Sequence, residues 1–159
     1  MKKEAIHSFT ARISQASKSE LVVILYEMAL TEIGEARQAH SEANLADFDK
    51  GLKRAQRCIS ELMATLDYRY PIAYDLLSLY IYTNRELIRA IYQRGVQPLD
   101  SPEQVLRKLL NGFEGVSSQD TSGPVMRNSQ QLYAGLTYGK GKLNETYLNP
   151  GNGNRGFIA

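Results

Sequence analysis

The chain has 159 residues, of which 43% are hydrophobic, and this is enough for one domain with a sizeable core and at most a short appendage. Its formal net charge is only +2 and its basic residues are scattered, which excludes the positive patch of a protein that binds nucleic acid or an anionic membrane. No run of about 18 apolar residues is present for membrane insertion, and the N-terminal residues lack the apolar stretch of a secretory signal. With Cys58 as its one cysteine, the composition predicts a cytoplasmic protein without an internal disulfide.

The first predicted elements are two helices. A long helix is predicted over residues 18–41, because Ser17 and Glu20 form an S-x-x-E capping box and apolar residues recur behind them at helical spacing. A short helix is possible before it, where three apolar residues are spaced to share one face: Ile6, Phe9 and Ile13. Two interpretations of this short helix stay open, namely that it closes one end of a bundle or that it covers a binding groove.

Two further long helices are predicted before residue 94. Asp47 is expected to cap the first of them, whose apolar residues repeat by four and three in the narrow seam of an antiparallel bundle: Phe48, Leu52, Ala55, Ile59, Leu62 and Leu66. Pro71 is expected to begin the next helix, which should end near Gln93 with Gly95 as its C′ residue. This helix has a core face and a second apolar stripe. The core face comprises Ile72, Leu76, Leu79, Thr83, Leu87 and Ala90, and the stripe comprises Tyr74, Leu77, Ile81, Ile88 and Tyr92.

The fourth main helix is predicted to begin at Ser101, which forms a second capping signature with Gln104. From Gly115 onward the composition changes to one rich in Gly, Ser and Asn, with no helical period. The sequence therefore predicts an all-α protein. It should consist of an antiparallel up-and-down helical bundle over residues 1–114 and an irregular C-terminal tail over residues 115–159.

No constellation of residues predicts catalysis, a cofactor or a metal site. His7 and His40 lie in separate polar segments without further ligands at metal-binding spacing. Cys58 lies beside the apolar seam, where a structural thiol is expected rather than a nucleophile. Arg37 and His40 form the one close pair that would suit a helical ribonuclease, and this alternative requires the two side chains to converge. We therefore predict a binding protein and not an enzyme.

Three motifs, in order, resemble the flagellin export chaperone family known as FliS over roughly residues 9–113. The first is QASKSELVVILYEMAL, where the family has a pattern like T-A/S-S-P-E-E-L-I-x-x-L-Y-D-G-A. Here Lys18 replaces the proline, Glu27 the aspartate and Met28 the glycine. The second motif comprises Arg54-Ala55-Gln56, Glu61-Leu62 and Thr65-Leu66-Asp67. The third comprises Ile72-Ala73, Leu76, Leu79-Tyr80, Tyr82, Asn84-Arg85 and Leu87.

The resemblance implies a cytosolic chaperone that binds the C-terminal segment of new flagellin, prevents premature polymerisation and presents the subunit to the flagellar export apparatus. A segment that folds on binding needs a long groove, and the second apolar stripe offers one wall for it. A regulatory or scaffold protein without an export role is the alternative, and the oligomeric state is left open. The tail supplies a further hypothesis, since spaced Tyr and Leu residues between Leu132 and Leu148 would compete with flagellin for the groove.

The predicted partner-binding residues lie on two helices. They are Val22, Tyr26 and Ile33 on the first long helix and Tyr74, Leu77, Ile81, Asn84, Arg85 and Ile88 on the third. Asn84 and Arg85 match the family motif, and two roles stay open for them: contact with the ligand backbone, or a hydrogen-bond knot within the bundle.

Overall fold

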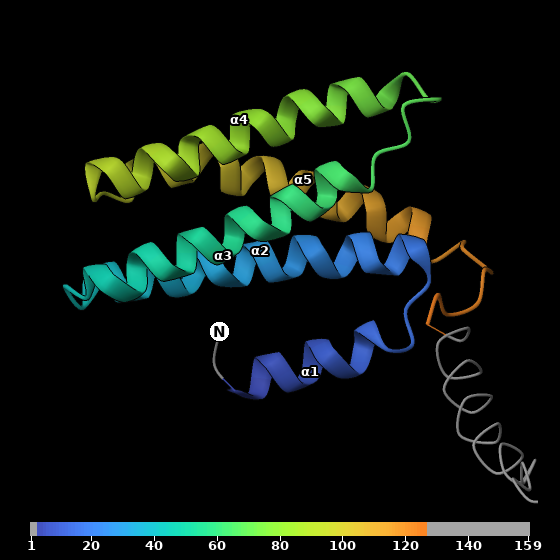
Figure 1. The fold of residues 1–159 in the computed structure, drawn as a ribbon, viewed down its shortest axis with the longest axis horizontal. Helices are drawn as coiled ribbons and strands as arrows, with labels where there is room; N and C mark the ends of the chain where they lie inside the picture. The colour runs from blue at the N-terminus through green and yellow to red at the C-terminus, as the bar shows by residue number, and fades with distance from the viewer. Residues whose placement is uncertain (1–2, 127–159) are drawn as a thin grey trace, which may run out of the picture. The chain divides into compact units, whose positions relative to one another are not determined.

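The computed structural model describes residues 3–126, and this range is entirely helical apart from turns and loops (Figure 1). Its elements are α1 (Lys3–Ile13), α2 (Lys18–Ser41), α3 (Leu45–Ala64), α4 (Ile72–Gln93), the 3₁₀ turn η1 (Gln97–Leu99) and α5 (Asp100–Ser117). Helices α2 to α5 run in alternating directions, with α2 packed on α3 and α5, and α4 packed on the same two helices. The prediction of an all-α bundle is confirmed. The Leu132–Leu148 segment lies outside the described residues.

Helices α2 and α3 each begin at a side-chain cap. At α2 the predicted capping box is confirmed: the Glu20 N–H donates to Ser17 Oγ, and the Ser17 N–H donates to the Glu20 carboxylate at 2.7 Å. The prediction of Asp47 as the cap of α3 is wrong. The cap is Asn44, whose side-chain oxygen accepts from the Asp47 N–H at 3.1 Å. The chain turns within three residues after α2, through Ala43 at φ 58°, so α3 begins earlier than the apolar pattern indicates.

The end of α4 differs from the prediction by one residue. Arg94, not Gly95, adopts the left-handed conformation, with φ 50°. The Gly95 N–H then returns to the Ala90 carbonyl at 3.2 Å, the long hydrogen bond of a Schellman motif. A non-glycine residue in this conformation costs about 1 kcal/mol. His40 Nε2 lies 3.0 Å from the Arg94 carbonyl oxygen, and this contact from α2 helps to offset the cost.

The last helix is longer than expected at both ends. It begins at Asp100 directly after η1, so Ser101 lies inside the first turn and does not cap the helix. Ser101 Oγ accepts from the Tyr82 hydroxyl at 2.8 Å. It continues to Ser117, past the expected end of the bundle at residue 114. The chain then returns to the start of α2, where the Val125 N–H donates to the Ala16 carbonyl at 3.0 Å. Ser19 Oγ also donates to the Asp120 carboxylate there.

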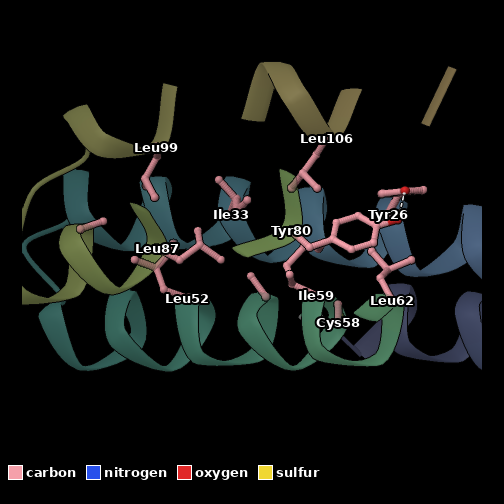
Figure 2. Packing of buried hydrophobic residues seen from close by; sticks show 14 of the residues in the cluster. Tyr26, Ile33, Leu52, Cys58, Ile59, Leu62, Tyr80, Leu87, Leu99 and Leu106 are labelled. Carbon is pink, nitrogen blue, oxygen red and sulfur yellow. Dashed lines mark hydrogen bonds between the residues drawn. The ribbon is translucent and has the colours of Figure 1, made fainter. Parts of the chain in front are cut away.

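The predicted seam of α3 forms the centre of the core (Figure 2). Five of its residues are fully buried and Leu66 is partly buried against them. Small residues let α3 approach α2 closely, since a Cβ atom on Gly51 would lie 3.1 Å from Ala36 Cβ and 3.2 Å from the Glu32 carbonyl oxygen. On α4 the predicted core face is buried or partly buried except at Ile72, for which the prediction is wrong. Ile72 is the first residue of its helix, lies beyond the end of α3, and is mostly exposed.

Two tyrosines join three helices inside the core. The hydroxyl groups of Tyr26 on α2 and Tyr80 on α4 are hydrogen-bonded to each other (Figure 2). The Tyr26 ring also lies 5.5 Å from the ring of Phe113 on α5. Burial raises the pKa of both tyrosines above the ordinary value, so both stay neutral. Because each hydroxyl is the partner of the other, these helices are joined without leaving either hydroxyl unsatisfied.

Thr83 carries a buried hydroxyl group that is not hydrogen-bonded within the described part of the chain. It is fully buried on α4, and its hydroxyl has no hydrogen-bond partner among the described residues. Replacing a buried, unsatisfied hydroxyl with a methyl group removes a desolvation cost. We therefore expect Thr83→Val to raise the free energy of unfolding by about 1 kcal/mol, measured by urea denaturation. Thr31→Val is the control and should not stabilise, because Thr31 Oγ1 donates to the Glu27 carbonyl at 2.8 Å. A loss of stability in Thr83→Val would contradict this assignment.

Cys58 is predicted to be unreactive in the folded protein. It is buried beside the seam, as expected, and burial raises the pKa of its thiol to about 11. The stability gained by keeping this thiol neutral is present below its unfolded pKa of about 8.5 and is lost as the pH rises through about 11. We expect iodoacetamide to label Cys58 rapidly only in urea. We also expect the free energy of unfolding to fall more steeply with alkaline pH in the wild type than in Cys58→Ala. Rapid labelling of the native protein would contradict the burial.

Candidate functional site

The outward side of α4 carries a line of large apolar side chains. We call this the outer stripe and define it as Tyr74, Leu77, Ile81, Ile88 and Tyr92. All of them except Leu77, which is half-buried, expose more than half of their surface. The predicted second stripe of this helix is therefore confirmed as an exposed apolar face. Its first and last residues are 18 positions apart, which corresponds to about 27 Å along the helix axis.

The apolar surface continues into the turn before α4. Tyr68 and Tyr70 are largely exposed there, next to the exposed Ile72, and the Tyr68 ring lies 5.5 Å from the Tyr74 ring. The sequence prediction of site residues did not include this turn. The signal that would have found it is the cluster of tyrosines, since tyrosine combines a large apolar ring with a polar tip and suits half-exposed interface positions.

Asn84 and Arg85 are adjacent in sequence but point to different neighbours. Asn84 Oδ1 accepts from Gln56 Nε2 at 3.0 Å, so its side chain takes part in the contact between α3 and α4. The guanidinium of Arg85 instead lies 5.6 Å from the centre of the Tyr82 ring and is 70% exposed. Asn84 thus forms a hydrogen bond within the bundle, as one of the two interpretations requires. Arg85 instead stands on the surface in line with the outer stripe.

The predicted site residues on α2 do not form a matching surface. Tyr26 and Ile33 are fully buried in the core, so neither has surface to offer a partner in this conformation (Figure 2). Val22 is partly buried against the same core. The cause is the central position of α2, which contacts α1, α3 and α5 and therefore has core contacts on several sides. Tyr26 and Ile33 are therefore core residues of the bundle.

Helix α1 contacts α2, and none of its described residues is buried. Arg12 forms a two-pronged ion pair with Glu27 of α2, and its guanidinium lies 5.9 Å from the centre of the Phe9 ring. Of the three apolar residues predicted to share a face, Ile6 remains about half exposed and the other two are partly buried. A polar-walled pocket of about 350 Å³ lies between the end of α1 and the start of α2, lined by Arg12, Gln15, Ala16, Glu20, Val23, Ile24 and Ser117.

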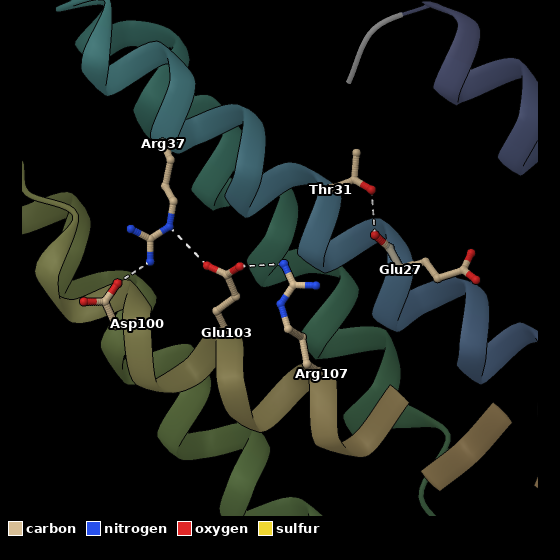
Figure 3. Close-up of polar contacts among 6 residues, drawn as sticks. All are labelled: Glu27, Thr31, Arg37, Asp100, Glu103 and Arg107. Carbon is tan, nitrogen blue, oxygen red and sulfur yellow. Dashed lines mark hydrogen bonds and ion pairs between the residues drawn. The ribbon is translucent and has the colours of Figure 1, made fainter. Parts of the chain in front are cut away.

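A polar network joins α2 to α5 (Figure 3). Arg37 donates to Asp100 at 2.6 Å and to Glu103 at 3.1 Å, and Glu103 also accepts from Arg107 at 2.8 Å. His40 instead contacts the carbonyl of Arg94 and the ring of Phe48. Arg37 and His40 therefore do not converge, and the arrangement that the ribonuclease alternative requires is not formed.

Residues 3–126 contain no group of three or more ligating side chains that could hold a metal ion. None of the helices in this range is both long and apolar enough to cross a bilayer.

The bundle and its outer stripe define a small all-α protein with a line of exposed apolar side chains on one helix. Residues 1–120, about three quarters of the chain, match the family model described as flagellar protein FliS. The chain belongs to the FliS family, so it is a chaperone of flagellar assembly that handles an export substrate. A search of curated proteins found no match.

Proposed function

We propose that this chaperone binds the C-terminal segment of flagellin along the outer stripe of α4. In the cytoplasm it holds the segment so that flagellin does not polymerise early, and it presents the subunit to the flagellar export apparatus. The observation that carries the proposal is the outer stripe itself, a line of apolar side chains about 27 Å long of which all but Leu77 are more than half exposed. The family match supplies the class of partner.

The shape of this surface suits a helical segment better than a compact protein. The outer stripe has the spacing of three, four and seven residues that marks one face of a helix, and an amphipathic helix presents its anchors at the same spacing. Covering the exposed half of Ile81 or Ile88 contributes about 1 kcal/mol each. Ordering a disordered segment costs about 2–5 kcal/mol, so several anchors must act together. A long stripe meets this requirement, whereas a single pocket does not.

The proposed surface comprises the outer stripe, Arg85 and the tyrosine turn at Tyr68 and Tyr70. Val22 on α2 and Asn84 on α4 stay predictions as partner contacts, with Asn84 having an additional role inside the bundle. The family match favours this function over that of a regulatory or scaffold protein without an export role.

Isothermal titration calorimetry tests the proposal. The full chain is titrated with a peptide that corresponds to the C-terminal segment of flagellin from the same organism, at several temperatures. Saturable binding with a negative heat-capacity change is expected, because apolar surface is buried. A peptide of equal length from the N-terminal segment of flagellin is the control. Binding to the control alone, or to neither peptide, would contradict the proposal.

A further inference from the structure

A positive charge interrupts the outer stripe near its middle. Its apolar residues fall into two groups, 74–81 and 88–92, and the position that continues the helical spacing between them is Arg85. This side chain is 70% exposed, so the guanidinium stands in the surface between Ile81 and Ile88. A purely apolar partner that covered the stripe would have to desolvate this charge without pairing it, which is unfavourable.

The charge is only partly compensated by its neighbours. Glu86 lies beneath it, with a side chain only 12% exposed, and its two oxygens are shared. One oxygen is 3.6 Å from Arg85 Nε, and the other is 3.5 Å from Nη1 of Arg89, which is 59% exposed. One carboxylate between two guanidinium groups leaves one positive charge on the surface. The distance of 3.6 Å is also too long for a good hydrogen bond, so the guanidinium keeps donors for a partner.

The guanidinium is held in position before a partner arrives. It lies 5.6 Å from the centre of the Tyr82 ring, in cation–π range. The Tyr82 hydroxyl donates to Ser101 Oγ of α5 at 2.8 Å, which fixes the ring against the bundle. A side chain that is ordered in advance loses less conformational entropy on binding.

A second copy of this chain is a poor occupant. Two copies of α4 that paired antiparallel about a two-fold axis, with their stripes fully overlapped, would bring the middle of one stripe against the middle of the other. Arg85 of one copy would then approach Arg85 of the other, and like charges that face each other at an interface cost several kcal/mol. The charge pattern instead favours a segment with a negative charge.

We propose that α4 selects an amphipathic helical segment in which an aspartate or glutamate lies between two apolar groups and pairs with Arg85. This inference rests on the proposed function and adds the chemistry of the segment and its register. The apolar residues provide the attraction, and a bidentate ion pair between carboxylate and guanidinium sets where along the stripe the segment docks.

A double-mutant cycle tests the inference. The probes are the flagellin C-terminal peptide and the same peptide with every Asp and Glu replaced by Asn and Gln. We expect Arg85→Gln to weaken binding of the acidic peptide about tenfold and to leave binding of the neutral peptide unchanged. Arg107→Gln is the matched control, because Arg107 is 63% exposed on α5 and should not affect binding of either peptide.

The outcomes separate this inference from the proposed function. The proposed ion pair is wrong if Arg85→Gln binds the acidic peptide as tightly as the wild type does. It is also wrong if this substitution weakens the binding of both peptides equally. If Ile81→Asp still abolishes binding in that case, the docking surface stands. If the wild type binds neither peptide, the proposed function fails and the inference fails with it.

Discussion

Ile81→Asp is expected to abolish binding of the flagellin C-terminal segment while the protein stays folded. Ile81 lies at the centre of the outer stripe with more than half of its surface exposed, so an aspartate there stays hydrated in the free protein. A bound segment would have to desolvate that carboxylate and would lose the apolar contact. The new carboxylate also lies one helical turn before Arg85 and would neutralise it. Together these effects should weaken binding more than about 100-fold.

The measurement is fluorescence anisotropy of a labelled peptide, with far-UV circular dichroism to confirm the helix content. Ser60→Asp on α3 is the control, since Ser60 is exposed on a different helix and should tolerate a carboxylate without loss of binding. Unfolding of Ile81→Asp would instead place Ile81 in the core. Wild-type affinity in this variant would show that the outer stripe is not the binding surface.

Leu87→Ala and Ile88→Ala are expected to have opposite effects on stability and binding. The two residues are neighbours on α4, but Leu87 is fully buried whereas Ile88 is about half exposed in the outer stripe. Removing the Leu87 side chain leaves a cavity and should cost about 2–5 kcal/mol of unfolding free energy. Removing that of Ile88 should cost less than about 1 kcal/mol of stability and weaken peptide binding several-fold.

Urea denaturation and peptide titration of the same two variants make the comparison. Under conditions where Leu87→Ala remains folded, its affinity for the peptide should equal that of the wild type. The assignment of inner and outer faces would be wrong if Ile88→Ala were the less stable variant, or if Leu87→Ala were the one that lost affinity.

Local chemistry made much of the fold predictable. The Ser17–Glu20 capping box and the seam of α3 are encoded by residues three and four positions apart, and both are confirmed. The exposed stripe of α4 was predictable for a similar reason, since the helix is more apolar than one core contact needs. The repeat of about 3.6 residues per turn sets the direction of each side chain around the helix axis, so two apolar faces on one helix can be distinguished from the sequence.

The same periodicity does not say how many neighbours surround a helix. Tyr26 and Ile33 were expected to face a groove, yet they are buried because α2 is enclosed by α1, α3 and α5. The left-handed residue after α4 was also unpredictable from local rules. Arg94 takes this conformation next to a glycine, and the contact that supports it comes from His40 on a distant part of the chain. Such tertiary contacts determine burial and backbone conformation where local sequence preferences do not.

Photo-crosslinking tests the central claim most directly, because it reports which surface the flagellin segment touches. Benzoylphenylalanine is placed at Ile88 on the outer stripe and, in a separate protein, at Lys53, an exposed residue of α3. Each protein is irradiated with the flagellin C-terminal peptide, and the adducts are mapped by mass spectrometry. We predict adducts from position 88 and none from position 53. Adducts from position 53 without any from position 88 would contradict binding along α4.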